Sequence, residues 1–229
     1  MEYLNYKLKS SLKSIPGIRK AVHGLVNPYT SFNDDRECIF IQIPKTASTS
    51  IAKAIGDKGN RHKKSIWYKR YDEKKFENYF SFGFVRNPWN RILSAFDYLK
   101  RGGGNKLDVK WSSKHLRDID SFSEFIKRLK IKRFRKRILS WQHFQPQWKF
   151  LCDEKHKLIV DYVGSYENIA QDIKKVENKI NMDIELGYEN VTPNKRINRY
   201  YDEESHRLVS NIYERDIKMF DYYSQKGGK

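Results

Sequence analysis

The chain has 229 residues and a formal net charge of +18, because 46 Lys and Arg residues face only 28 Asp and Glu residues. A hydrophobic content of 38% with 14% aromatic residues is enough for a core and excludes a disordered basic tail. Two cysteines exclude a disulfide framework and argue against a thiolate metal site. The charge predicts an anionic partner, and composition does not choose among nucleic acid, a membrane surface, a phosphate-bearing cofactor and an acidic polysaccharide.

The first 36 residues have the character of a peripheral arm. Basic residues alternate there with scattered apolar ones up to the turn-rich run 27–31, and an amphipathic helix is predicted at 4–12. We therefore divide the chain into a basic N-terminal arm, residues 1–36, and one domain, residues 37–229. No signal-peptide core or membrane-length apolar run is found, which predicts a cytoplasmic protein, with peripheral membrane contact as the alternative for the arm.

Two segments repeat the order strand, loop, helix. The run 38–43 (CIFIQI) predicts a buried strand that ends at Pro44, and a helix follows from Ile51. The run 80–85 (FSFGFV) predicts a second strand, which is followed by a helix at 89–100. A helix at 122–141, a strand at 158–163 and helices at 169–180 and 202–220 complete the predicted elements. This alternation indicates a single α/β domain with a central, mostly parallel sheet flanked by helices.

The loop after the first strand has the composition of an anion-binding site. It reads PKTASTS over residues 44–50, so small residues, hydroxyl groups and the start of a helix follow one mobile cation, Lys45. The nucleotide-triphosphate loop differs, because it contains glycines and carries its Lys near the end. This difference disfavours a kinase or other phosphotransferase with an atypical phosphate loop, which stays open as an alternative.

The second strand ends in a comparable motif, FVRNPWNRILSAF at 84–96. Arg86 lies at the strand end and Ser94 on the helix that follows, so a guanidinium and a hydroxyl can reach one phosphate. Together, IPKTASTS and FVRNPWNRILSAF resemble the 5′-phosphosulfate loop and the 3′-phosphate motif of sulfotransferases that use 3′-phosphoadenosine 5′-phosphosulfate. The carbohydrate branch, with heparan 2-O-sulfotransferases and bacterial family 2 enzymes, is most similar. Segments at 145–151, 161–168 and 213–220 resemble the same family.

The resemblance implies a P-loop-like sulfotransferase fold, transfer of a sulfuryl group to a hydroxyl, and the product adenosine 3′,5′-bisphosphate. It also implies which residues bind the donor, and they are Lys45, Thr46, Ala47, Ser48, Thr49 and Ser50 for the 5′-phosphosulfate and Arg86 and Ser94 for the 3′-phosphate. Arg196, in a loop that closes over the cofactor in some relatives, is implied as a weaker phosphate ligand. We expect no metal, because fixed cations take its place, and we expect Lys45 to stabilise charge on the bridging oxygen.

The acceptor hydroxyl needs a base, and a histidine with a near-neutral pKa suits proton removal from a sugar alcohol. His62 is the first candidate, because it lies between the two motifs, where family members with a histidine base carry theirs. His143 is the second candidate, although a hydrogen-bonded structural role is favoured there. A carboxylate base stays open, as in some relatives.

Two stretches without acids contain much of the excess charge. Residues 58–71 carry six Lys or Arg and residues 127–137 carry eight. We expect them to border the acceptor site and bind an anionic glycan. The competing interpretation is a nucleic-acid-binding module in which Trp67, Tyr68 and Phe134 stack on bases. No nucleic-acid motif accompanies these runs, so no nucleic-acid partner is expected.

Overall fold

The computed structural model of the chain describes residues 26–59, 62–187 and 200–223. At its centre is a parallel sheet of three strands in the order β1-β2-β3, formed by β1 (Cys38–Ile41), β2 (Phe80–Val85) and β3 (Tyr162–Ser165). Cys38 pairs with Phe80 in the first ladder and Phe82 with Tyr162 in the second. The α/β class and the parallel sheet expected from the sequence are therefore confirmed.

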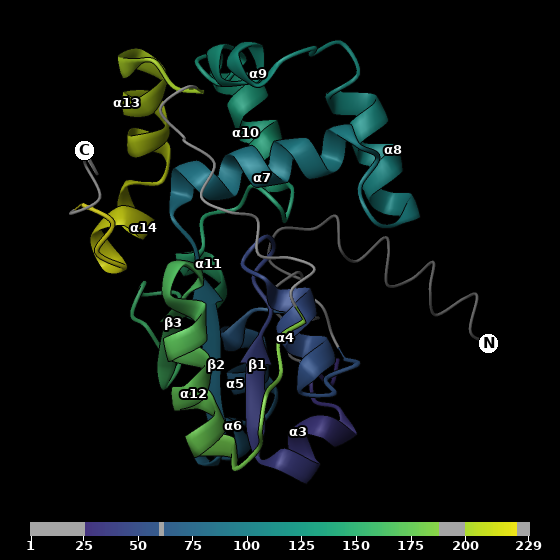
Figure 1. Cartoon of the computed structure of the whole chain (residues 1–229), viewed down its shortest axis with the longest axis vertical. Helices are drawn as coiled ribbons and strands as arrows, with labels where there is room; N and C mark the ends of the chain where they lie inside the picture. Colours follow the sequence, from purple (N-terminus) through teal and green to yellow (C-terminus); the bar gives the residue numbers. More distant parts are fainter. Residues whose placement is uncertain (1–25, 60–61, 188–199, 224–229) are drawn as a thin grey trace.

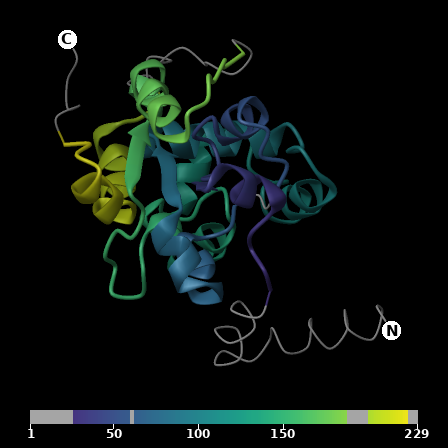
Figure 2. The same ribbon diagram turned by 90° about the horizontal axis from the view of Figure 1, so that it is seen from below.

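Helices connect the strands and cover both faces of the sheet, as Figure 1 shows. Before β2 lie α3 (Ser31–Arg36), α4 (Ser48–Ala54), α5 (Ser65–Tyr71) and α6 (Glu73–Asn78). Between β2 and β3 lie α7 (Pro88–Lys100), α8 (Lys106–His115), α9 (Phe122–Arg128), α10 (Lys132–Ser140) and α11 (Trp148–Leu151). After β3 follow η1 (Tyr166–Asn168), α12 (Ile169–Ile180), α13 (Glu203–Ile212) and α14 (Glu214–Met219). Helices α7 to α10 and α13 form a second layer beyond one end of the sheet (Figures 1 and 2).

The alternation of side chains along β1 and β2 divides the core into two parts. Phe40, Phe82 and Phe84 point to the face covered by α4 and α12, where the core includes Ile51 and Val176. The opposite face packs against α5, α6 and α11 and continues into the helical layer. Its buried side chains include Ile39, Ile41, Tyr68, Phe76, Phe150, Phe96 and Phe125. Because both faces are covered, the strands read as nearly continuous apolar runs.

The predicted helix at 122–141 is wrong in one respect, because the structure breaks it into α9 and α10. In α9 the buried side chains Phe122, Phe125 and Ile126 recur at helical spacing, and Leu129 follows. An unbroken helix would place Arg133 and Lys136 next on that stripe. The break at 129–131 turns both cations outward and lets Ile138 enter the core.

Two further expectations need correction. The apolar run 158–160 leaves the sheet edge to pair with α11, through a bridge between Leu158 and Cys152, so β3 begins only at Tyr162. The helix at 202–220 is interrupted at Tyr213, where the buried hydroxyl donates to the Phe144 carbonyl oxygen over 2.8 Å.

Part of the segment assigned to the arm packs on the domain. Tyr29 is buried among the aromatic rings of α5 and α6, and the Asn33 side chain donates to the Cys38 carbonyl oxygen over 2.8 Å. The helix predicted at 4–12 lies outside the described residues. No helix in the described ranges is both long and apolar enough to cross a membrane.

Candidate active site

The carboxyl ends of three parallel strands lie at one edge of the sheet, and this arrangement brings the two sequence motifs together. Pro44 to Ala47 form the loop after β1, Arg86 follows β2, and Tyr166 follows β3. A cavity of about 280 Å³ opens between this edge, α7 and α8. Its lining includes Pro44, Lys45, Ala47, Ser48, Thr49, Ser50, His62, Arg86, Ser94, Tyr98, Asn105, Asp108, Gln142, His143 and Tyr166.

The loop after β1 is a tight turn without glycine. Lys45 and Ala47 adopt left-handed backbone conformations, with φ of 72° and 61°. The buried hydroxyl of Thr46 donates to the Ile43 carbonyl oxygen over 3.0 Å, which fixes the turn. Thr46 therefore differs from the expected hydroxyl donor, because its side chain faces the protein and lies outside the cavity lining, whereas Ser48, Thr49 and Ser50 line the cavity.

The Lys45 side chain lies across the cavity wall. Its Nζ is 4.1 Å from the centre of the Tyr98 ring, a cation–π contact. Burial, together with the charges of Arg86 and Arg101, lowers the pKa of Lys45 to about 8. A buried ammonium beside other cations is costly, so a bound anion would stabilise it.

Arg86 supplies the second buried cation. Its guanidinium carbon lies 4.0 Å from the Tyr166 ring centre, and one of its amino groups donates to the Lys45 carbonyl oxygen over 3.3 Å. Its main chain is fixed on both sides by the Gln147 side chain, which accepts from the Arg86 amide and donates to the Arg86 carbonyl, each over 2.8 Å. Within the described structure the buried Arg86 Nε has no hydrogen-bond partner. A buried donor without a partner in a cationic pocket fits an anionic ligand.

Arg91, one turn into α7, holds the loop after β1 in place. It is almost fully buried, and its Nε donates to the Pro44 carbonyl oxygen over 2.9 Å while an amino group donates to the Gln145 carbonyl oxygen over 2.9 Å. No role was predicted for Arg91, yet its guanidinium connects α7 to two segments that are distant in the chain.

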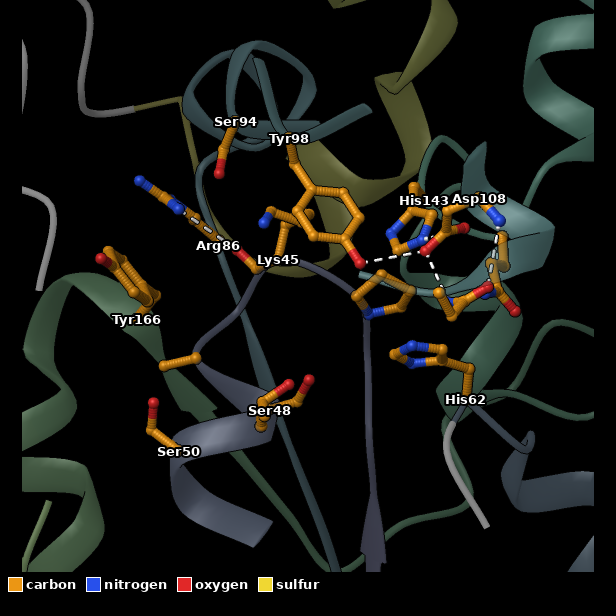
Figure 3. Close-up of a pocket in the computed structure, with 15 residues that line it drawn as sticks. Lys45, Ser48, Ser50, His62, Arg86, Ser94, Tyr98, Asp108, His143 and Tyr166 are labelled. Carbon is orange, nitrogen blue, oxygen red and sulfur yellow. Dashed lines mark hydrogen bonds and ion pairs between the residues drawn. The ribbon is translucent and has the colours of Figure 1, made fainter. Parts of the chain in front are cut away.

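The structure brings His62 into the same cavity (Figure 3). Its Nδ1 lies 2.9 Å from the Gln42 carbonyl oxygen. A carbonyl only accepts hydrogen bonds, so Nδ1 carries the proton in the neutral ring and Nε2 keeps its lone pair. This tautomer suits the predicted role of His62 as a proton acceptor.

A second imidazole, His143, lies 5.8 Å from the His62 ring, measured between ring centres. Its Nε2 lies 3.1 Å from Asp108 Oδ1, and the carboxylate is completely buried. The other carboxylate oxygen of Asp108 accepts from the Tyr98 hydroxyl over 3.0 Å and from the Asn105 side chain over 2.7 Å. Burial, more than any neighbouring charge, lowers the pKa of His143 to about 4.

The predicted site residues converge well. Lys45, the 47–50 segment, His62, Arg86 and Ser94 share one cavity, whereas Arg196 lies outside the described residues. Sequence reasoning missed Tyr98, Asn105, Asp108, Gln142 and Tyr166. Two of these carry a signal in the chain: Tyr98 lies one helical turn beyond Ser94, and Asp108 is the single acid between Arg101 and Arg117.

A parallel α/β sheet with cations at the carboxyl ends of neighbouring strands is an arrangement that suits binding of a phosphate-type anion. Residues 28–223 match the sequence profile of the Sulfotransferase family, and the chain belongs to this family. A stretch of 119 residues is 32% identical to an uncharacterized protein of Archaeoglobus fulgidus, covering 51% of this chain and 80% of that protein. No solved structure matches significantly.

Proposed function

We propose that this protein transfers the sulfuryl group of 3′-phosphoadenosine 5′-phosphosulfate to a hydroxyl of a carbohydrate acceptor. The observation that carries the proposal is the pair of cations, half-buried Lys45 and buried Arg86, in one cavity with an unpartnered Arg86 Nε. Two anionic groups on one donor, the 5′-phosphosulfate and the 3′-phosphate, match two cations on separate strand ends.

Each residue of the site has a distinct part in the proposed reaction. Lys45 and the hydroxyls of Ser48 to Ser50 hold the 5′-phosphosulfate, and Arg86 with Ser94 holds the 3′-phosphate. The bound donor supplies the sulfuryl group, which passes to the acceptor oxygen as its bond to the 5′-phosphate breaks. Lys45 stabilises the negative charge that the 5′-phosphate gains, and His62 Nε2 takes the hydroxyl proton.

Binding of adenosine 3′,5′-bisphosphate tests the donor assignment. The protein is expected to bind an immobilised form of this nucleotide and to be eluted by the free nucleotide but not by ATP. Elution by ATP would support the phosphotransferase alternative instead. Retention on immobilised DNA or RNA with no nucleotide competition would support the nucleic-acid alternative.

Replacement of His62 by alanine is expected to lower turnover by roughly two to four orders of magnitude. The matched control is His62→Gln, whose amide can still donate to the Gln42 carbonyl oxygen but has no basic nitrogen. Unchanged turnover in both variants would assign the base elsewhere.

The surface charges favour an anionic acceptor near α8 and α10. In the first acid-free run, Lys69 pairs with Glu73 and Arg70 pairs with Glu154, and burial lowers the pKa of Lys64. A different set forms what we call the α8–α10 surface, and it comprises the exposed cations Lys106, Lys110, Lys114, Lys132, Arg133, Lys136 and Arg137. No carboxylate among the described residues forms an ion pair with these seven side chains.

Helices α8 and α10 also connect directly to the cavity. Asn105 begins α8 and lines the cavity, and Gln142 and His143 follow α10 and line it too. The two helices meet where Trp111 stacks on Trp141, with 5.0 Å between ring centres. Two of the aromatic residues that would stack on bases in the nucleic-acid alternative pack inside the protein instead. Tyr68 is buried, and Phe134 packs against the core.

Neutralising part of the α8–α10 surface tests the anionic acceptor. Changing Lys132, Arg133 and Lys136 to Gln is expected to weaken binding of desulfated heparin about tenfold, since three exposed pairs contribute roughly 0.5 kcal/mol each. The dependence of affinity on salt should become shallower. The control with the same change in net charge is Lys69, Lys175 and Lys218 to Gln, because these lysines already pair with carboxylates. Equal losses in both triple variants, measured by calorimetry, would contradict a localised acceptor surface.

A further inference from the structure

The pocket contains two imidazole groups whose tautomers are set in opposite ways. His62 donates through Nδ1 to a backbone carbonyl, whereas His143 has its Nε2 beside the Asp108 carboxylate. A carboxylate accepts, so His143 Nε2 carries the proton and Nδ1 keeps the lone pair. Each histidine therefore presents one acceptor nitrogen, and both rings line the same cavity.

The His143 acceptor nitrogen has no partner among the described residues. The side chain is 5% exposed, and Nδ1 is fully buried without a hydrogen bond. A buried acceptor of this kind is unfavourable unless a donor reaches it. The phosphate and sulfuryl groups of the proposed donor carry only acceptor oxygens, so they cannot supply that hydrogen. A hydroxyl of the acceptor sugar can.

The surroundings keep His143 in this form. Asp108 is fixed by the Tyr98 hydroxyl and by Asn105, so the carboxylate cannot rotate away from the ring. Gly103 lets the chain pass close behind it, since a Cβ there would lie 2.4 Å from Asp108 Cβ. With its pKa lowered to about 4, His143 is neutral near pH 7 and is a weak base but a directed hydrogen-bond acceptor.

Resting on the proposed sulfuryl transfer, we propose that His143 Nδ1 binds a second hydroxyl of the acceptor, next to the hydroxyl that His62 deprotonates. The acceptor class is thus a sugar ring with two neighbouring free hydroxyls, and His143 determines which of them is sulfated. Asp108 is the positioning residue that fixes the His143 tautomer. The two rings are neighbours in the cavity, with 5.8 Å between their centres.

The tautomer can be read without knowing the natural acceptor. In protein labelled with ¹⁵N at histidine, His143 should show an unprotonated Nδ1 and a protonated Nε2 at pH 7. Asp108→Asn should reverse this pattern, because the new amide can donate to Nε2 while its oxygen still accepts from Tyr98. A cationic His143 at pH 7, or an unprotonated Nε2 in the unchanged protein, would overturn the proposal.

Desulfated heparin, whose uronate residues carry adjacent hydroxyls, is the probe for hydroxyl binding. At saturating concentration it should shift the His143 Nδ1 resonance, and His143→Ala should raise KM for this probe about tenfold or more with a smaller change in kcat. Loss of nucleotide binding in Lys45 or Arg86 variants reports on the donor assignment separately. A silent His143 resonance in the presence of bound probe would refute the hydroxyl contact while leaving the donor assignment intact.

Discussion

Replacing Lys45 by methionine is expected to reduce sulfuryl transfer by about two to three orders of magnitude. The ammonium packs against the Tyr98 ring in the loop after β1, where the bridging oxygen of the donor would gain charge. Such a charge acts strongly where it is partly desolvated and already oriented before the reaction. The measurement is the rate of adenosine 3′,5′-bisphosphate release at saturating donor.

The pH dependence gives this prediction a specific form. With a pKa of about 8, Lys45 is mainly charged at pH 7 and loses its proton as pH rises through that value. Affinity for adenosine 3′,5′-bisphosphate should therefore be stronger at pH 7 than at pH 9 in the unchanged protein, and bound anion should shift the midpoint upward. In Lys45→Met the affinity should be low and nearly independent of pH over this interval.

We do not expect the loss of activity in Lys45→Met to come from unfolding. Removing a desolvated charge close to Arg86 relieves an unfavourable interaction, so the melting temperature of Lys45→Met should match or exceed that of the unchanged protein. Lys45→Arg keeps the charge in a larger group and serves as the second variant. Normal turnover in Lys45→Met would remove Lys45 from the mechanism.

Replacing Arg86 by alanine is expected to weaken binding of adenosine 3′,5′-bisphosphate about a hundredfold or more. The guanidinium is buried at the end of β2, stacks on Tyr166 and keeps one unpartnered nitrogen. A buried group of this kind contributes several kcal/mol to a charge-assisted contact. Calorimetric titration gives the affinity directly.

A comparison of nucleotides separates phosphate recognition from a general defect. Adenosine 5′-phosphate lacks the 3′-phosphate, so its affinity should be nearly the same for the unchanged protein and for Arg86→Ala. Arg86→Lys, which keeps a charge but loses the planar fork, should be intermediate for the bisphosphate. Equal losses for both nucleotides would move Arg86 from the 3′-phosphate to another part of the ligand.

The first two strands and the two loop motifs that follow them could be predicted from local sequence. The run 80–85 forms β2 with the predicted bounds, because a continuous apolar segment suits a strand buried on both faces. Lys45 and Arg86 could be expected to converge, since each follows a parallel strand and such strand ends share one edge. The order and spacing of these motifs also predicted the family.

The helical layer was harder to predict from the sequence, because a local pattern of residues does not show on which side of a helix the core lies. Residues 122–141 have helix-forming composition throughout, yet the need to keep Arg133 and Lys136 outside breaks the helix at 129–131. The direction of the Thr46 hydroxyl could not be predicted from local sequence either. It donates to the carbonyl oxygen of Ile43, and this contact depends on how the turn folds. From composition alone, Thr46 was predicted to bind the donor in the same way as the neighbouring hydroxyl residues.

By itself, the sequence determined the family, the α/β class and the two cations proposed to hold the donor, because these depend on short motifs and on the period of apolar residues. Only the tertiary structure brought Asp108, His143 and Tyr98 together with Lys45. These residues come from separate helices and loops, so no spacing in the chain relates them. Packing of α7 and α8 against the sheet edge creates the polar cluster, and burial then gives Lys45 and His143 their lowered pKa values.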